Sequence, residues 1–419
     1  MMRPSSRSEM SMVSQSRIDR SNSVEIDLGG AEFKANARQH LAAWAKRPPF
    51  YVFNNGPPQV IVGRYADVMK VFTDPVRFSS EVPRGPGFEQ FDRFMGGQFM
   101  TQMEGERHGR LRRLIMPAFS ARRMAQIEGQ ITGIIDGLLD AIEERAQEFD
   151  GMHDYAAQLV VGALLTAMLN LDKAQQRILI DFQEVQPLAT AIKAGQSFPP
   201  ECVAAYDKSA ELVRAVIADR RENPQSDFLT DLVQAHDQAD KLTDRELFDM
   251  IFGVFGALAT TPRSGGGALY VLYTHRDQLQ QLIDNPDLIP EAVEECLRIA
   301  GNGYFTFARI ATCNTELGGT WIEKGMIVRP SPQAANYDPD AFPDPLRFDI
   351  HRKPKRILTF GAGPHHCVGH LLGRNTLGIA IRQLLARFPQ ARLADPNFRP
   401  MYGGAVGELR LKSLPMLTH

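Results

Sequence analysis

Apolar positions recur at helical spacing through most of the chain beyond residue 120. This periodicity predicts helices over residues 124–148, 155–171, 174–192 and 200–221. A capping box, in which Thr243 precedes Glu246 by three positions, predicts the start of another long helix that continues toward residue 272. Near the C-terminus, a further helix is indicated by one apolar face formed by Leu377, Ile381, Leu384, Leu385 and Phe388.

Extended segments are few and short. Residues 49–53 and 59–63 are two apolar runs separated by an Asn-Asn-Gly sequence, which predicts a β-hairpin turning on Asn55-Gly56. A short helix is expected over residues 65–72, and an alternating run at 305–309 suggests another strand. The pattern therefore predicts a mainly α protein with a small β-rich lobe near the N-terminus.

Composition narrows the possible classes. The chain has 419 residues, 43% of them hydrophobic, and a net charge of −2, which gives no general reason to expect binding to nucleic acid or a membrane. No apolar run reaches the length of a membrane span, and residues 1–25 lack the apolar core of a secretory signal, so we expect a disordered tail followed by one catalytic domain at 26–419.

The four cysteines at positions 202, 296, 313 and 367 are far apart in the sequence and form no CxxC pair. This argues against a disulfide framework or a zinc site and fits the reducing cytoplasm.

One stretch carries a chemical signal: the ten residues from Phe360 to Gly369 read FGAGPHHCVG. Glycine tolerates backbone conformations that a Cβ forbids, so such a loop can lie flat against a planar group. Cys367 is expected at or just before a helix N-terminus, where the dipole favours a thiolate, a good soft ligand for iron. A lone cysteine is otherwise most often a small buried apolar residue.

The filled pattern Phe-Gly-x-Gly-x-His-x-Cys-x-Gly closely resembles the haem-binding signature of the cytochrome P450 family. The resemblance extends over about residues 45–415. It implies that Cys367 is the axial ligand of haem b and that His365 contacts a haem propionate. It also implies that Phe360, Gly361 and Gly369 belong to the cofactor-binding loop.

Two other segments match the family's propionate-binding positions. His108 and Arg112 are four residues apart and can share one helix face, which on its own would be a solvated basic face. Their surroundings resemble the family's C-helix, which implies that both bind a propionate, with Arg112 supplying charge-assisted hydrogen bonds. Arg309 matches a third side chain of this kind.

Aromatic residues are the candidates for a substrate pocket. Phe88, Phe91 and Phe99 lie in an irregular, glycine-rich stretch where the family places its substrate-covering loop. Ordinary packing beneath a long loop is the alternative explanation. Phe305 and Phe307, close to Arg309, are two further candidates.

The long helix that begins at Thr243 resembles the one that crosses the distal haem face in the family. Small residues at Gly256 and Ala257 would leave room for oxygen, and Thr260 could relay protons. Ala259 stands where the family has an acid. Pro262 and the three glycines at 265–267 are unfavourable inside a helix and predict a kink or a widened groove.

The family resemblance also gives a structural role to three charged residues. Glu295 and Arg298 form a Glu-x-x-Arg pair, a common helical ion pair when found alone. Their place about seventy residues before the Cys loop matches the family. Arg347 is expected to be the third member of the charge cluster.

The resemblance implies oxygen-dependent hydroxylation, or a related oxidation, of a small lipophilic molecule, with electrons from a ferredoxin and its reductase. Basic residues near the proximal elements could dock an acidic partner, although such runs are usually solvated. They are Arg110, Arg113, Arg122, Arg123, Arg352, Lys353, Lys355, Arg356 and Arg374.

Two other functions remain open from the sequence. One is a haem-thiolate peroxygenase or a nitric oxide reductase, which is raised by Ala259. The other is a non-enzymatic haem sensor, against which Thr260 and the aromatic residues argue.

Overall fold

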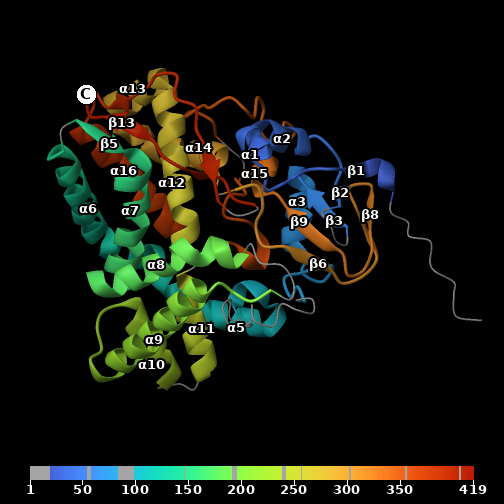
Figure 1. The fold of residues 1–419 in the computed structure, drawn as a ribbon, viewed down its shortest axis with the longest axis horizontal. Coiled ribbons are helices and arrows are strands. Elements are labelled where there is room, and N and C mark those ends of the chain that lie inside the picture. The colour runs from blue at the N-terminus through green and yellow to red at the C-terminus, as the bar shows by residue number, and fades with distance from the viewer. Residues whose placement is uncertain are drawn as a thin grey trace, which may run out of the picture.

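The fold is a large helical body with a β-rich lobe at one side, seen in a computed structural model (Figure 1). The structure describes residues 19–53, 58–83, 99–145, 147–190, 196–237, 242–255, 257–301, 303–353, 356–404 and 407–419. Within these residues no helix has the length and apolar character needed to cross a membrane.

Helices form most of the body. They are α1 (Ala31–Ala35), α2 (Ala37–Trp44), α3 (Tyr65–Thr73), α5 (Gly105–Ile115), α6 (Ala121–Glu143), α7 (Ala157–Val160), α8 (Lys173–Thr190), α9 (Pro200–Glu222), α10 (Phe228–Asp237), α11 (Asp244–Val254), α12 (Ala257–Thr274), α13 (Arg276–Asp284), α14 (Ile289–Ala300), α15 (Pro332–Ala335) and α16 (His370–Arg387). The π-helical turns Gly151–Ala156 and Val161–Met168 flank α7. The four predicted helices beyond residue 120 are confirmed, as is the helix before the C-terminus.

Strands are short and fall into four sheets. They are β1 (Ser23–Val24), β2 (Phe50–Val52), β3 (Gln59–Val62), β4 (Phe78–Ser79), β5 (Glu148–Asp150), β6 (Arg309–Ala311), β7 (Thr315–Leu317), β8 (Thr320–Ile322), β9 (Ile327–Pro330), β10 (Arg392–Leu393), β11 (Tyr402–Gly403), β12 (Arg410–Leu411) and β13 (Pro415–Leu417). The main sheet has the order β1-β2-β3-β9-β6-β4.

The predicted hairpin is confirmed: β2 and β3 pair antiparallel, with Tyr51 opposite Val60. Its Asn-Gly turn lies outside the described residues. The lobe is not built from the N-terminal part alone, because β9 pairs parallel with β3 and β6 pairs antiparallel with β9. The sheet therefore joins the first hundred residues to the segment that contains Arg309.

The chain enters the fold earlier than residue 26. Ser23 and Val24 pair in parallel with β2, and the Asn22 side chain donates a 2.8 Å hydrogen bond to the carbonyl of Pro49. The disordered tail predicted for residues 1–25 therefore ends earlier than expected, because backbone pairing and this side-chain contact hold residues 22–24 against the sheet. Residues 1–18 lie outside the description.

The first predicted helix is also shorter than its apolar pattern. It ends at Glu143, and Gln147 then adopts a left-handed backbone with φ of 70°. The next residues form β5, which pairs antiparallel with the C-terminal strand β13. Sheet pairing with a distant segment therefore overrides the helical periodicity at Glu148, the last residue of the predicted range.

The long helix expected from Thr243 to residue 272 is two helices. The capping box is present, with the Thr243 hydroxyl accepting from the Glu246 N–H and the Glu246 carboxylate accepting from the Thr243 N–H. The helix stops at Val254, and α12 starts at Ala257 and passes through Pro262. The interruption thus falls one and a half turns before the proline.

Helix α12 runs through the middle of the body (Figure 1). It packs against α14 on one side and against α7 and its π-helical flank on another. The three consecutive glycines allow this close packing: a Cβ at Gly266 would clash with the Met152 sulfur, and one at Gly267 would lie 2.9 Å from the Ala300 Cβ. Their role in the structure is helix–helix contact.

Candidate functional site

The loop that presents Cys367 is built on two left-handed glycines. Gly361 and Gly363 both have φ of 66°, which L-residues with a Cβ rarely adopt. A Cβ at Gly363 would also clash with the carbonyl of Phe72 at the end of α3. The Cys367 N–H donates a 2.9 Å hydrogen bond back to the Phe360 carbonyl and closes the loop. The Cys loop, residues 360–369, is thus fixed against the β-rich lobe.

Cys367 lies three residues before α16, which begins at His370, as expected for a residue just ahead of a helix N-terminus. Its thiol is solvent-accessible, yet burial is the largest influence on it, so it faces a recess within the molecule. Burial raises the pKa of Cys367, whereas the Gly369 N–H and the charges of Arg112 and Arg374 lower it.

The net direction is upward, although the Gly369 N–H just before the helix acts in the direction that the sequence predicts. Desolvation of the anion outweighs the dipole and the nearby arginines. A metal cation at the sulfur would stabilise the ionised form.

Two predicted propionate contacts meet beside the Cys loop. The rings of His108, on α5, and His365 are tilted against each other with centroids 4.3 Å apart. His108 is buried, and its Nε2 has no hydrogen-bond partner among the described residues. Burial, with the charges of His365 and Arg112, lowers the pKa of His108 to about 4. It is therefore a neutral imidazole at pH 7.

Glu104 also belongs to this cluster, although it was not among the residues predicted from the sequence. One of its carboxylate oxygens lies 3.2 Å from His365 Nε2, and the other accepts a 2.6 Å hydrogen bond from the Ser80 N–H. Burial raises the pKa of Glu104, but these hydrogen bonds more than offset that and leave it lowered. Its place as the residue before α5 is the only signal that could have drawn attention to it.

The two arginines predicted to bind propionates lie on different elements, Arg112 on α5 and Arg309 on β6. Arg112, on α5, donates a 2.6 Å hydrogen bond to the His366 carbonyl, and its charge acts on Cys367. Arg309, the first residue of β6, is buried, and among the described residues it donates to the carbonyls of Phe307 and Ala308. Burial lowers the pKa of both guanidinium groups. Neither forms an ion pair with a carboxylate of the described residues.

These observations fit an anionic, iron-containing planar cofactor. A buried imidazole with an unpartnered nitrogen and two desolvated guanidinium groups without carboxylate partners are groups that a carboxylate-bearing ligand would satisfy. The same ligand must bring a cation to the Cys367 sulfur. No cluster of His, Cys, Asp and Glu that could hold a metal alone is found in the described part of the chain. Haem carries both features in one molecule.

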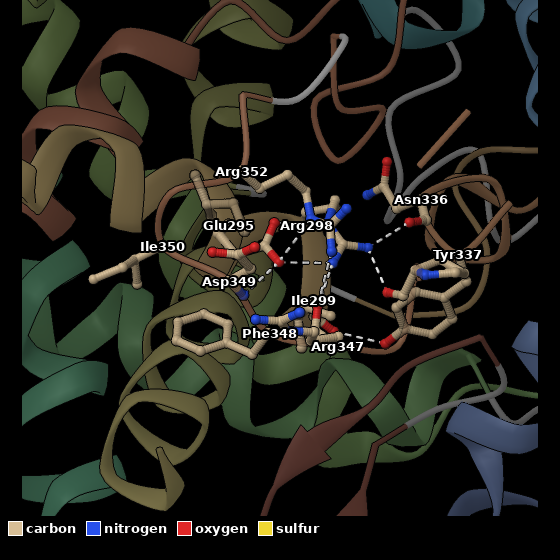
Figure 2. Close-up of polar contacts among 12 residues, drawn as sticks. Glu295, Arg298, Ile299, Asn336, Tyr337, Arg347, Phe348, Asp349, Ile350 and Arg352 are labelled. Carbon is tan, nitrogen blue, oxygen red and sulfur yellow. Dashed lines mark hydrogen bonds and ion pairs between the residues drawn. The ribbon is translucent and has the colours of Figure 1, made fainter. Parts of the chain in front are cut away.

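Glu295 and Arg298 of α14 form a buried ion pair (Figure 2). Arg298 binds both carboxylate oxygens of Glu295 at 2.7 Å, and both side chains are 0% exposed. Arg298 also donates to the carbonyls of Asn336 and Pro345 at 2.8 and 2.7 Å. Because every charge has partners, the desolvation cost of the pair is offset and the surrounding loops are held in place.

Figure 2 also shows that Arg347 is not the third charged side chain of this cluster. Its backbone carbonyl accepts hydrogen bonds from Arg298 and Arg352. The third charge is that of Arg352, whose Nε lies 3.2 Å from a Glu295 oxygen. The family match therefore pointed to the right segment. Within it, Arg347 contributes its backbone carbonyl, and Arg352, five positions later, contributes the charged side chain.

The cluster is linked to the Cys loop by one polar side chain. The Asn336 side chain accepts from the Leu358 N–H at 2.8 Å and donates to the Thr359 hydroxyl at 2.9 Å. Thr359 in turn donates to the Leu297 carbonyl at 2.8 Å, on the helix that carries the ion pair. Residues 358–359 immediately precede the loop, so α14 and the Cys loop are rigidly connected.

The predicted distal residues are only partly described. Ala257, Ala259 and Thr260 lie in the first turns of α12, and Gly256 lies outside the described residues. Thr260 is therefore on a helix, as the proton-relay hypothesis requires. Its role as the relay stays a prediction.

The aromatic residues predicted to line a substrate pocket lie in different surroundings, and two of them are not described. Phe88 and Phe91 lie outside the described residues. Phe99 is partly buried, and its ring stacks on Phe252 of α11 with centroids 6.4 Å apart. Phe305 stacks on Trp44 at 5.7 Å, whereas the Phe307 side chain is 56% exposed. Of the three described residues, Phe99 and Phe305 therefore pack against different elements, and Phe307 faces solvent.

Four of the nine basic residues expected to form a docking patch are engaged in contacts within the protein. Arg110 pairs with Glu246, Arg374 pairs with Glu294, and Arg352 belongs to the buried cluster. Arg123 donates to the Ser226 carbonyl. The exposed basic residues that remain in the described ranges are Arg113, Arg122, Lys353 and Arg356. Lys355 lies outside them.

A surface hollow of about 560 Å³ opens next to Arg113. It is lined by Gly109, Arg112, Arg113, Met116 and Pro117. Arg112 connects this hollow to the carbonyl next to Cys367. The hollow combines two arginines with two apolar residues, a composition suited to an acidic protein surface.

Comparison with known proteins places the chain in a family. A model described as "Cytochrome P450" matches residues 32–396. Mycinamicin IV hydroxylase/epoxidase of Micromonospora griseorubida is 33% identical over 359 residues, which is 84% of this chain and 86% of that protein. Nocardicin C N-oxygenase of Nocardia uniformis subsp. tsuyamanensis is 36% identical over 343 residues, covering 80% and 83%.

Solved structures agree with the sequence comparison. The myxobacterial cytochrome P450 CYP267B1, solved with myristic acid, superposes with a TM-score of 0.83 at 27% identity and covers 94% of this chain and 98% of its own. The LnmA cytochrome P450 hydroxylase of Streptomyces atroolivaceus has a TM-score of 0.76 at 32% identity, with 91% and 96% covered. The mainly α fold with small sheets is thus shared along almost the whole length.

Proposed function

The chain belongs to the cytochrome P450 family, and we propose that it oxidises a small apolar organic molecule with electrons delivered by a ferredoxin. Family membership makes it an oxidoreductase, a haem-thiolate monooxygenase that uses O2 and protoporphyrin IX haem. The observation that best supports the proposed site is the Cys loop, in which two left-handed glycines present Cys367 beside the half-buried Arg112, which forms no ion pair with a carboxylate of the described residues.

Cys367 would bind the haem iron through its sulfur. His108, Arg112, Arg309 and His365 would hold the propionates, the histidines as hydrogen-bond donors and the arginines through charge as well. The bound haem supplies oxygen activation, which a thiolate ligand promotes. The charges of Arg112 and Arg374 and the Gly369 N–H stabilise the anionic sulfur from the protein side.

On the distal side, Thr260 would hold a proton at its hydroxyl oxygen and pass it inward. The family's neighbouring acid is replaced by Ala259, so protons must reach Thr260 by another route. General acid–base catalysis of this kind contributes about 10²- to 10⁴-fold to a rate.

A small apolar substrate is supported by the aromatic side chains near the distal helix. Phe252 contacts Phe99, Phe182 and Tyr206 with ring centroids 6.4, 5.4 and 5.4 Å apart. This aromatic cluster brings α8, α9 and α11 together with Phe99, the residue before the short 3-10 turn Met100–Gln102. Among the relatives, one is named for hydroxylation and epoxidation of mycinamicin IV and another for N-oxygenation of nocardicin C. An organic natural product is the substrate class that these names suggest.

The ferredoxin is proposed from the hollow beside Arg113, because its two arginines are complementary to an acidic partner. The hollow leads through Arg112 to the carbonyl beside Cys367, which gives a short route for an electron toward the sulfur.

The experiment is a screen of small lipophilic compounds for the low-spin to high-spin optical change of the ferric enzyme. Compounds that cause the change are then incubated with ferredoxin, its reductase, nicotinamide and O2, and the products are analysed. An oxygenated product formed only with the complete system supports the proposal. Turnover with peroxide alone, or consumption of nitric oxide with nicotinamide and no ferredoxin, would replace it.

Thr260 is tested with the compound that gives the largest optical change. Thr260→Ala should lower the product formed per nicotinamide oxidised by about tenfold or more. The missing reducing equivalents should appear as hydrogen peroxide, while haem content and the optical change stay as in the parent enzyme. Thr261→Ala, one position further along α12, is the control and should keep full coupling. A fully coupled Thr260→Ala enzyme would show that Thr260 is not the relay.

A further inference from the structure

Arg263 lies one helical turn beyond Ala259 on α12. Residues four apart on a helix lie on the same face, and residues three apart are also neighbours. Position 263 therefore adjoins both Ala259, where the acid is missing, and Thr260. A charged residue at this point is costly to bury unless it is paired and hydrogen-bonded.

The partner of Arg263 comes from the C-terminal part of the chain. An Nη of Arg263 lies 2.6 Å from a carboxylate oxygen of Glu408, 145 positions away. The Arg263 side chain is only 10% exposed, whereas that of Glu408 is 25% exposed. The pair thus runs from a buried guanidinium near the distal helix to a carboxylate that reaches solvent.

Glu408 is held close to a predicted pocket residue. It forms an antiparallel bridge with Gly303, and the carbonyl of the preceding Gly407 accepts a 3.0 Å hydrogen bond from the Tyr304 N–H. The next residue is Phe305. The carboxylate is therefore positioned by backbone contacts and does not depend on a mobile side chain alone.

One donor of Arg263 is unused. Its Nε is buried and has no hydrogen-bond partner among the described residues, although the residue is nine-tenths buried. Such a buried N–H normally binds a protein acceptor or an ordered water. Burial lowers the pKa of Arg263, and the Glu408 charge opposes this, so the guanidinium remains a cation with five donors.

The shape of the guanidinium couples this free donor to Glu408. A planar guanidinium presents its N–H groups in a fixed fork. When the Glu408 carboxylate accepts a hydrogen bond from one Nη of Arg263, a water bound to Nε can lie within hydrogen-bond reach of the same carboxylate. Ordered waters of this kind typically make about three hydrogen bonds, and Arg263 Nε and Glu408 would supply two of them.

We propose that Arg263 and Glu408 are positioning residues that form the proton entry to Thr260 and replace the carboxylate missing at position 259. Arg263 holds a water at Nε, and Glu408 exchanges protons between solvent and that water. The inference rests on the proposed role of Thr260 as the relay.

The proton balance is simple. A solvent proton binds a Glu408 carboxylate oxygen and makes it neutral. The acid O–H bond then breaks as the held water gains that proton and gives up another toward Thr260, and Glu408 returns to its carboxylate form. Arg263 keeps its charge and its protons throughout, and no electron moves in these steps.

The first test is a high-resolution crystal structure of the haem-loaded enzyme. We expect an ordered water bonded to both Arg263 Nε and Glu408. An Nε that donates to a protein carbonyl instead, or a site without water, would overturn the proposal. This measurement needs no substrate and no variant.

The second test uses Glu408→Gln, which keeps an acceptor for Arg263 but cannot exchange a proton as a carboxylate does. With the compound selected in the optical screen, product per nicotinamide oxidised should fall about tenfold, peroxide should rise, and the solvent isotope effect of product formation should increase. Haem content and the urea unfolding midpoint should stay unchanged. A coupled Glu408→Gln enzyme would contradict the inference.

Two further variants distinguish a role of the Arg263–Glu408 pair in proton entry from a purely structural role. Arg263→Lys keeps the charge and the ion pair but has no Nε fork, so it should uncouple turnover without loss of stability. Asp154→Asn is the matched control, because Asp154 is 26% exposed and pairs with Arg145 at 2.7 Å away from this pair. It should remain coupled. An equal yield of product per nicotinamide oxidised in Arg263→Lys and Asp154→Asn would show that the Arg263–Glu408 pair has only a structural role.

The outcome for Thr260→Ala distinguishes this inference from the proposed function. If Thr260→Ala uncouples and Glu408→Gln does not, Thr260 is the relay and the entry lies elsewhere. If Glu408→Gln uncouples and Thr260→Ala does not, the entry through Glu408 stands and the delivery to Thr260 is wrong.

Discussion

Cys367 is the residue on which the proposed chemistry depends, and its surroundings are arranged to control its charge. Burial raises its pKa, while a backbone N–H and two arginines lower it. The protein alone leaves the thiol favoured, and a metal cation at the sulfur reverses this balance. The loop therefore provides geometry and partial charge compensation, and the ion completes it.

We predict that the ferrous–carbonyl adduct has the strongly red-shifted Soret band of thiolate ligation, and that Cys367→Ala abolishes it. The other three cysteines are either buried away from the loop or exposed elsewhere. Cys296→Ala is the control, because Cys296 is buried on α14 and should not affect the band. A red-shifted band in Cys367→Ala would assign the ligand to another residue.

Arg112 is expected to retain the cofactor through a charge-assisted contact to a propionate. Arg112→Ala should speed haem transfer to apomyoglobin, because a carboxylate that loses its buried partner costs about 3–5 kcal/mol. Arg113→Ala is the natural control, since that side chain is exposed. The transfer is followed by the Soret absorbance of the acceptor. Equal transfer rates for the two variants would exclude Arg112 as an anchor.

At the scale of elements, the Cys loop is held by contacts from three directions. Gly363 packs against the end of α3, Asn336 binds the strand-like segment before the loop, and Arg112 of α5 donates to His366. Two of these contacts, those from α3 and α5, join segments more than 250 residues apart in the chain. The site is therefore stable only when the whole helical body is assembled.

Asp150 shows the same dependence on distant segments. Its carboxylate accepts from the N–H groups of Met152 and His153 at the start of a π-helical turn, and from the Leu414 N–H and the Ser413 hydroxyl beside β13. Burial raises the pKa of Asp150, but the hydrogen bonds outweigh this and lower it below its usual value of 3.8.

A depressed folded-state pKa gives stability that is fully present above the unfolded value and is lost as pH falls through the folded one. Asp150→Asn should therefore lower the urea midpoint at pH 7, and the difference from the parent should shrink below about pH 4. Asp395→Asn, at an exposed turn, is the control and should shift the midpoint little. A difference that grows toward low pH would contradict the assignment.

At the scale of the molecule, the proximal face is less basic than the sequence suggested. Three of the nine expected basic residues are committed to ion pairs with glutamates. Of the four exposed basic residues that remain, Arg113 lines the hollow. Docking should therefore depend on few residues.

Arg113→Glu should slow electron transfer from ferredoxin and flatten its dependence on salt, because steering by opposite charges acts mainly on the association rate. Arg177→Glu, an exposed arginine on α8, is the control. Stopped-flow reduction at low and high salt measures both. An unchanged rate for Arg113→Glu at low salt would show that the partner docks elsewhere.

The sequence by itself determined the family, the candidate haem ligand and the helical elements. Glycines at 361 and 363, the capping box and the apolar helix faces are local features, and local backbone energetics and periodicity decide them. The charge pair of Glu295 and Arg298 was also readable, because its members are one turn apart.

Only the tertiary structure decided which distant groups complete these local features. It replaced Arg347 by Arg352 in the buried cluster, extended the ordered chain back to residues 22–24, and ended the first long helix at Glu143. It also brought Glu104 to His365 and Glu408 to Arg263. Pairing, burial and backbone turns act between residues far apart in sequence, so no local pattern encodes them.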